Sequence, residues 1–284
     1  MSRNRNRTGA PNPQDTAPPA HVVNQQTEAF SFVVPTEFVE LPSKGQFYPE
    51  GHPLHNQETL EIKHMTAREE DMLTSRALLK KGMALERVMQ SIIVNKAVDP
   101  NSLLVGDRNA ILVAARISAY GSQYTTSVTC PACNSAQEYS FNLNEVQPYD
   151  GNELTDEVAK NNGDGTFTTI LPRTKVEVQF RLLNGIDEKS LLQQVENARK
   201  NRKEENTVTR QLRQIIISVN GNTEPENLNY VVNNMPSMDS RHLRYAFKVA
   251  TPNIDMTQHF ECNECDHEQD MEVPLTADFF WPDA

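Results

Sequence analysis

The chain has 284 residues, with 27 lysines and arginines against 38 aspartates and glutamates, so its formal net charge is −11. This length can bury a sizeable core, and the acidic balance gives the chain as a whole no electrostatic reason to bind nucleic acid or anionic lipid. No apolar run approaches the ~20 residues that cross a bilayer, and no signal peptide is recognisable, so we expect a soluble protein made in the cytosol. Structural disulfides are rare in that compartment.

Residues 1–30 are rich in Pro, Asn, Gln and Arg and almost free of large apolar side chains. Such a segment cannot offset the entropy cost of ordering, so we predict a disordered N-terminal arm that a partner could capture. Its arginines Arg3, Arg5 and Arg7 concentrate basic charge at the N-terminus. This pattern is typical of a solvated tail, with an arm that binds nucleic acid as the alternative.

A strand and three helices are predicted before the first cysteines. Alternating apolar residues at positions 60–62 predict the strand. Thr66 and Glu69 fit a capping box, in which each side chain bonds to the backbone of the other residue, so a helix is expected to start there. Apolar residues at helical spacing predict further helices from Leu85 and from Asp107.

The same order of patterns recurs after a polar connector at residues 151–166. The likeness is strongest between residues 107–143 and residues 239–275, which align without a gap and match both cysteine pairs. Apolar positions match in the same register: Ile111 with Leu243, Ala114 with Ala246, Ile117 with Val249, Val128 with Phe260, Phe141 with Val273, and Leu143 with Leu275. Any two helix-rich stretches can be aligned in part, but chance seldom aligns cysteines and apolar positions together.

We interpret this likeness as an internal duplication and predict an α+β fold. Each unit would contain a strand, two helices, a third helix and a cysteine hairpin, and the two units would be related by a pseudo-twofold arrangement. The predicted organisation is a disordered arm at 1–30, a first unit at 31–150, a linker at 151–166 and a second unit at 167–284.

All four cysteines occur as Cys-x-x-Cys pairs, Cys130 with Cys133 and Cys262 with Cys265. A strand-like approach precedes each pair and an alternating stretch follows it, which predicts two hairpins that carry the cysteines in their turns. Four thiolates form a closed tetrahedral site with bonds of ~2.3 Å. We therefore predict one structural Zn²⁺ per chain, which would join the two units.

Three alternatives to this zinc site are open. A thioredoxin-type redox pair needs a helix after the cysteines, and here a strand pattern follows. The four residues could instead be free core cysteines. Two separate metal sites completed by His259 or His267 are the third alternative, although His267 has no counterpart in the first hairpin, where Ser135 stands.

No catalytic constellation is recognisable, because the chain has no Gly-rich phosphate loop, no G-x-S-x-G and no H-E-x-x-H motif. Asp107, Arg108, Asp239 and Arg241 are interpreted as N-cap and first-turn charges of two helices. A closed thiolate site also leaves no open position for a substrate. We predict no catalytic residue, no small-molecule substrate and a scaffold or binding role.

Four motifs together resemble a known family. They are E-L-P-S-K-G-Q-F-Y-P at 40–49, L-E-I-K-H-M-T-A-R-E-E-D at 60–71, G-D-R-N-A-I-L-V-A-A-R-I at 106–117 and C-P-A-C at 130–133. In these motifs the chain resembles the baseplate hub subunit family of T-even-like contractile-tailed bacteriophages, over about residues 35–145 and more loosely beyond. The zinc prediction rests on this sequence and not on the resemblance.

The resemblance implies a non-enzymatic structural or assembly protein of the phage tail baseplate. Its partners would be other hub and tail proteins or further copies of itself, with no nucleic acid and no membrane. It would lie in the virion tail and, during assembly, in the host cytoplasm. The aromatic run Phe279, Phe280 and Trp281 either closes the core of the second unit or contacts a partner.

The competing class is a nucleic-acid-binding zinc protein, such as a viral late transcription factor. The charges near the cysteines argue against it, because no Lys or Arg lies between Cys130 and Leu143. Acidic residues surround both cysteine pairs instead: Glu138, Glu261, Glu264, Asp266, Glu268 and Asp270.

Overall fold

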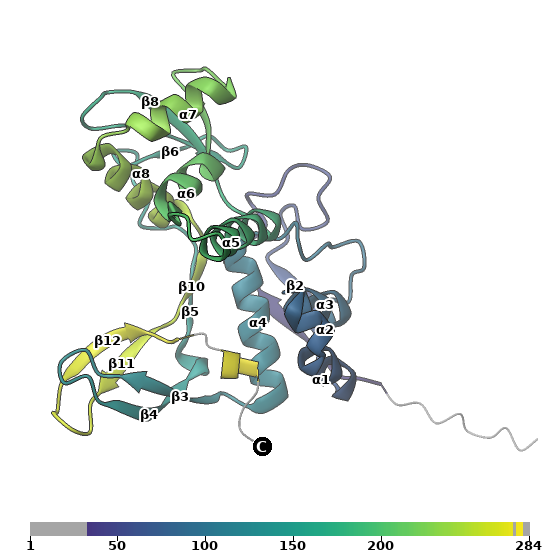
Figure 1. Ribbon diagram of the computed structural model, residues 1–284. Helices are drawn as coiled ribbons and strands as arrows, with labels where there is room; N and C mark the ends of the chain where they lie inside the picture. Colours follow the sequence, from purple (N-terminus) through teal and green to yellow (C-terminus); the bar gives the residue numbers. More distant parts are fainter. Residues whose placement is uncertain (1–32, 275–276, 281–284) are drawn as a thin grey trace, which may run out of the picture. The chain divides into compact units, whose positions relative to one another are not determined.

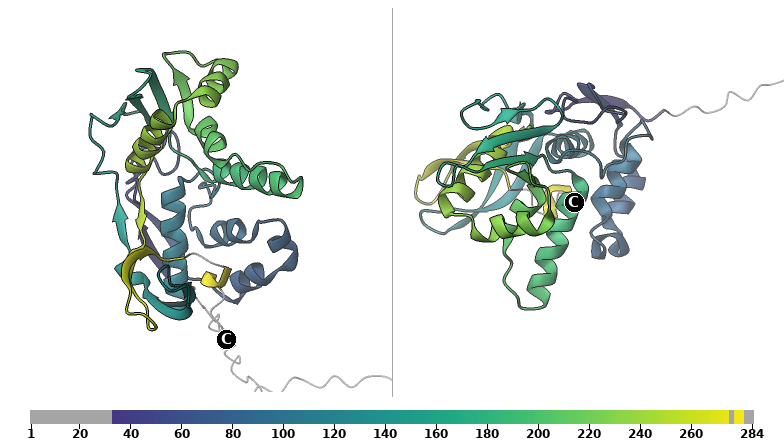
Figure 2. Two further views of the ribbon diagram at one scale, coloured as in Figure 1. Left: turned by 60° about the vertical axis from the view of Figure 1, so that its left-hand side comes forward. Right: turned by 90° about the horizontal axis from the view of Figure 1, so that it is seen from above.

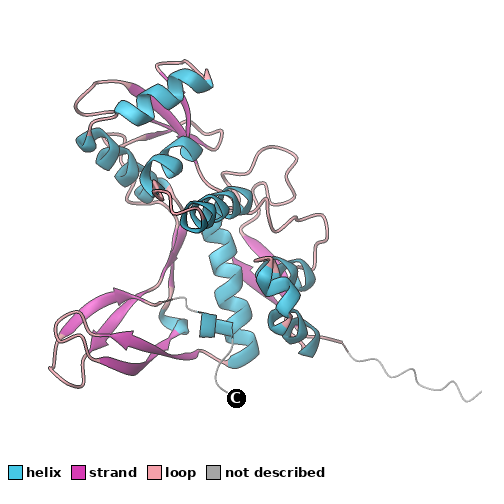
Figure 3. Ribbon diagram, in the orientation of Figure 1, coloured by secondary structure: helices cyan, strands magenta, loops and turns pink. Residues whose placement is uncertain are grey.

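The computed structural model describes residues 33–274 and 277–280. The predicted disordered arm at 1–30 and Trp281 lie outside these residues. From Val34 onward the chain belongs to one compact unit. The described residues form eight α-helices and several small antiparallel sheets, which confirms the α+β class (Figures 1 and 3).

The first half opens with a two-stranded antiparallel sheet followed by helices. The elements are β1 (Thr36–Glu40), β2 (Thr59–Lys63), α1 (Ala67–Thr74), α2 (Arg76–Lys80), α3 (Ala84–Ile92) and α4 (Val105–Tyr120). The capping box at Thr66 and Glu69 is confirmed as the start of α1. The sequence predicted one continuous helix here, but Ser75 has an extended backbone (ψ 109°) that separates α1 from α2.

The first cysteine hairpin follows α4 directly. It consists of β3 (Gln123–Thr129) and β4 (Ala136–Asn142), paired antiparallel, and is followed by a 3₁₀ turn, η1 (Leu143–Glu145), and by β5 (Gln147–Tyr149). Tyr124, Thr126 and Val128 alternate inward along β3, as the period of two in a half-buried strand requires.

The second half is built around a four-stranded antiparallel sheet in the order β6-β7-β8-β9. Its strands are β6 (Lys160–Asn161), β7 (Thr166–Ile170), β8 (Glu177–Arg181) and β9 (Ile216–Val219), and its helices are α5 (Gly185–Lys200), α6 (Thr207–Ile215), α7 (Pro225–Asn234) and α8 (Ser237–Ala250). The predicted polar connector thus contributes β6. Helix α7 was not expected from the sequence, because Val232 is its only buried residue and its pattern is weak.

After α8 come β10 (Asn253–Asp255), the second cysteine hairpin β11 (Thr257–Glu261) and β12 (Glu268–Glu272), and the 3₁₀ turn η2 (Ala277–Phe280). Phe279 and Phe280 in η2 are buried. The ring of Phe279 lies 5.1 Å from that of Tyr124 in β3, with the planes nearly perpendicular. Phe279 therefore packs against the first hairpin, and Phe280 packs against Phe279.

The two halves of the chain share one hydrophobic core, which contains Leu41, Ile111, Phe180 and Leu243 among others. Strand β5 from the first half pairs with β10 from the second. Gly106, near the start of α4, lies so close to this region that an added Cβ would be 2.0 Å from the Pro252 carbonyl oxygen. No helix in the described part of the chain is long and apolar enough to cross a membrane.

Candidate metal centre

Both cysteine pairs lie in turns with the same backbone hydrogen bonds. In the first hairpin the Cys130 N–H donates to the Ser135 carbonyl (2.8 Å), and the Asn134 N–H donates to the Cys130 carbonyl (2.9 Å). The second hairpin repeats these bonds from Cys262 N–H to the His267 carbonyl (2.9 Å) and from Asp266 N–H to the Cys262 carbonyl (3.0 Å). Asn134 and Asp266 have left-handed backbones (φ 59° and 51°), which Asn and Asp tolerate better than most residues.

The two hairpins pack face to face, and both views in Figure 2 place them side by side. The ring of Tyr139 lies 5.0 Å from Phe141 in its own hairpin and 5.1 Å from Phe260 in the other. The Tyr139 hydroxyl donates to the His259 carbonyl (3.1 Å). The Gln137 side-chain amide donates to the Glu261 carbonyl (3.0 Å). Apolar contacts and hydrogen bonds together therefore bring the two cysteine turns together.

All four cysteine sulfurs converge at this interface. Cys130 Sγ lies 3.8 Å from Cys265 Sγ, Cys133 Sγ lies 3.7 Å from Cys262 Sγ, and all four atoms lie within 4.8 Å of one another. A tetrahedron whose corners lie ~2.3 Å from its centre has an edge of about 3.8 Å. Disulfide sulfurs would be ~2.05 Å apart, and the four thiols here are free. The four sulfurs can therefore bind one metal ion.

The sequence matches the family described as T4 bacteriophage base plate protein over residues 34–281. The chain belongs to this family. No curated protein and no solved structure matches it. The matched range includes all four cysteines of this baseplate protein.

The structure also bears on the alternatives to a shared site. Strands β4 and β12 follow the cysteine pairs of the baseplate protein, so neither pair has the helix of a thioredoxin-type site. Cys130 and Cys262 are buried, but Cys133 and Cys265 are exposed and are not core residues. Among the residues that the structure describes, the potential metal-binding group contains these four cysteines and no histidine.

Ser135 and nearby backbone amides favour the thiolate forms of two cysteines. The Ser135 hydroxyl lies 3.0 Å from Cys133 Sγ and 3.7 Å from Cys262 Sγ. The hydroxyl and N–H of Ser135 lower the pKa of Cys133. The N–H of Glu264, followed by the Ser135 hydroxyl, lowers the pKa of Cys262 to about 6. The pKa of Cys265 is raised to about 12, by Cys133 ahead of burial and Cys262. The sequence analysis did not identify Ser135 as a neighbour of the cysteine cluster.

Asp107 and Asp239 do not act as N-caps, contrary to one part of the prediction. The caps of α4 and α8 are Leu104 and Pro236, and neither makes a side-chain capping bond. Each aspartate lies in the first helical turn and holds an earlier loop. Asp107 accepts from Ser43 N–H (3.0 Å), Ser43 Oγ (2.6 Å) and Tyr48 OH (2.7 Å). Asp239 accepts from Arg173 N–H (2.7 Å), Thr174 N–H (3.0 Å) and Thr174 Oγ1 (2.7 Å).

Proposed function

We propose that this baseplate protein is a scaffold of the phage tail hub, with one structural Zn²⁺ that joins the two halves of the chain. The observation that carries this proposal is the approach of the sulfurs at 3.7–3.8 Å, from turns that lie far apart in the sequence. Four thiolates leave zinc no open coordination position, so such a site stabilises structure and offers a substrate no place to bind the metal.

An internal duplication underlies this arrangement, with the two hairpins as equivalent parts of units 31–150 and 167–284. Three features support it. Helices α4 and α8 start at Val105 and Ser237, which have the same offset as the cysteine pairs. Both α1 and α5 start with a capping box, and both first-turn aspartates hold a preceding loop by three hydrogen bonds. A metal between equivalent hairpins would lie on the pseudo-twofold axis.

The zinc site would supply much of the stability of the hairpin region. Structural zinc binds small peptides with apparent free energies of ~10–16 kcal/mol, which is comparable to the stability of a whole domain. The partners of the resulting rigid body are other hub and tail proteins, or further copies of the chain, first in the host cytoplasm and then in the virion. The arm at 1–30 would fold along such a partner.

Two variants in the phage that encodes the chain would test the scaffold function. Removal of residues 1–30 should leave the body folded with its zinc and weaken its association with hub components. Cys262→Ser should do the opposite, because it loosens the body first and loses partners only as a consequence. Electron microscopy of infected-cell lysates should show stalled hub or tail intermediates for both variants. Normal infectious tails from both would contradict the scaffold proposal.

A further inference from the structure

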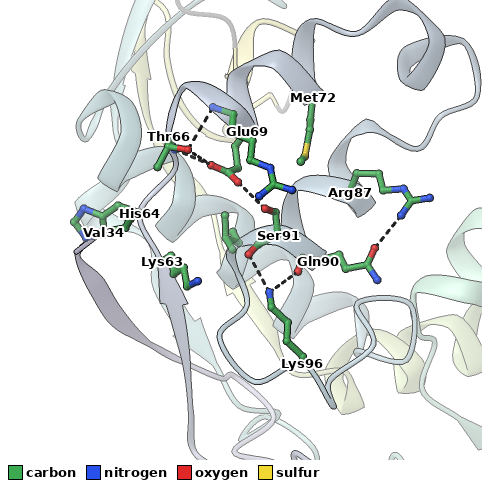
Figure 4. A pocket seen from close by; sticks show the side chains of 12 residues that line it. Val34, Lys63, His64, Thr66, Glu69, Met72, Arg87, Gln90, Ser91 and Lys96 are labelled. Carbon is green, nitrogen blue, oxygen red and sulfur yellow. Dashed lines mark hydrogen bonds between the residues drawn. The ribbon is translucent and has the colours of Figure 1, made fainter. Parts of the chain in front are cut away.

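A basic hollow of about 500 Å³ lies on the surface, away from the cysteine cluster. It is bounded by the end of β2, the start of α1, and α3 (Figure 4). Its lining contains Lys63, Arg68, Arg87 and Lys96 but only one carboxylate, Glu69. Such a concentration of positive charge is unusual on a chain with a net charge of −11.

Both carboxylate oxygens of Glu69 already accept hydrogen bonds within the chain. One carboxylate oxygen accepts from the Thr66 N–H (2.9 Å) and the Thr66 hydroxyl (2.5 Å), and the other accepts from the Ser91 hydroxyl (2.6 Å). The dashed lines of Figure 4 show these bonds on the α1 side of the hollow. Glu69 therefore holds the capping box and ties α1 to α3.

Among the residues that the structure describes, the cations of the hollow form no ion pair with a carboxylate. Lys96 donates to three carbonyl oxygens at the end of α3, at 2.6–3.1 Å. Within the described part of the chain, Lys63 and Arg68 form no ion pair. Burial, followed by the positive charges of Lys63 and Arg68, lowers the pKa of Lys96 although Glu69 opposes this shift, so both cations lie close enough to Lys96 to repel it. An anion in the hollow would relieve this repulsion.

The start of α5 shows how the same local fold can neutralise its cation. Arg181 precedes the cap residue Asn184 by three positions, as Lys63 precedes Thr66. Arg181 forms two hydrogen bonds with the capping-box carboxylate of Asp187 (2.6 and 2.8 Å). The uncompensated charge beside α1 is therefore not a consequence of the backbone arrangement.

We propose that the basic hollow binds an acidic segment of a neighbouring polypeptide. Its carboxylates would meet Lys63 and Arg68, and an apolar side chain would contact Met72 at the wall of the hollow. A nucleic acid fits less well, because its phosphates would continue past the exposed carboxylates of Glu70 and Asp71 on the same helix. The inference rests on the proposed scaffold function in one respect only, because that function makes a neighbouring baseplate subunit the source of the segment.

Fluorescence anisotropy with the purified full chain tests the hollow directly. The probe is a fluorescein-labelled peptide of sequence EELEELEE, titrated at low and at high salt. We expect saturable binding that salt weakens, and the double variant Lys63→Glu with Arg68→Glu should weaken it by about ten-fold or more. The matched control Lys203→Glu reverses an exposed charge after α5 and should leave binding unchanged. Hydrogen exchange of α1 and α3 would verify that the double variant is folded.

Failure of the peptide to bind, or equal binding by the double variant and the wild type, would overturn the docking site. Tighter binding of a single-stranded DNA oligonucleotide through the same residues would also overturn it. Because the titration uses the purified chain alone, none of these results would contradict the proposal of a zinc-joined scaffold.

Carbodiimide treatment of assembled tails provides the second test, since it joins a lysine amine to a carboxylate that touches it. Peptide mass spectrometry should find Lys63 linked to an Asp or Glu of a different tail protein. Lys63 linked only within its own chain, or not at all, would contradict the proposal.

Discussion

The starts of α1 and α5 have the same backbone design but use their charges differently. At both sites a capping box is preceded by a cation at the end of a strand, Lys63 or Arg181. The cation beside α5 is held by Asp187, whereas the carboxylate beside α1 bonds only to hydroxyls and backbone. The fold requires only the backbone hydrogen bonds of the cap. The charge of the neighbouring cation is therefore free to pair within the chain, as at Arg181, or to contact a partner, as proposed for Lys63.

The cysteine hairpins show the opposite case, since each brings one buried and one exposed cysteine to the same cluster. This shared arrangement leads to the largest predicted effect. Cys133→Ser and Cys265→Ser should each abolish metal binding and destabilise the protein by a similar amount, on the order of 5 kcal/mol. Urea unfolding with metal analysis would measure both. Ser127→Ala, an exposed change on β3, is the control and should stay within about 0.5 kcal/mol. Strongly unequal effects of the two cysteine variants would contradict the claim that both hairpins contribute equally to one metal site.

The two first-turn aspartates should respond to pH in opposite directions. Burial raises the pKa of Asp107, so its contribution to stability is lost as pH rises through its folded pKa. For Asp239, burial opposes the shift, but the N–H groups of Arg173 and Thr174 and the Thr174 hydroxyl lower its pKa. Its contribution is present above the ordinary value for aspartate and is lost as pH falls through the folded pKa.

Asp107→Asn and Asp239→Asn test this difference. At neutral pH Asp239→Asn should cost about 1–3 kcal/mol, because its buried donors lose a charged acceptor, and Asp107→Asn should cost less. The cost of Asp239→Asn should shrink as the solution is acidified below the ordinary aspartate pKa. As the solution is acidified, the cost of Asp107→Asn should instead grow. The growth should occur in the pH range in which Asp107 is protonated in the native state and ionised in the unfolded state. Urea unfolding at several pH values would measure both, and parallel profiles would contradict the assigned shifts.

The smallest predicted effect concerns the two cations themselves. Arg181→Gln should destabilise the chain by about 1 kcal/mol, because it removes a partly exposed double hydrogen bond to Asp187. Lys63→Gln should stay within about 0.5 kcal/mol, since its charge contributes to no ion pair among the described residues. Thermal unfolding of the two variants side by side would measure this, and a larger cost for Lys63→Gln would indicate an internal role for that cation.

Sequence patterns predicted the features that depend on neighbouring residues. The capping box at Thr66, the strands that flank each cysteine pair and the helices that start near Asp107 and Asp239 all follow from local spacing. The break at Ser75 was missed because apolar residues continue in helical register on both sides of it. The basic hollow was missed because Lys63, Arg68 and Lys96 meet only through the packing of α1 against α3.

The central claim is that one zinc ion joins the two cysteine hairpins. Native mass spectrometry of the full chain, purified without chelator, tests it most directly when combined with elemental analysis. The proposal predicts one zinc per chain in the wild type and none in Cys262→Ser. A wild-type chain without zinc, or a Cys262→Ser chain that keeps its full zinc content, would contradict it.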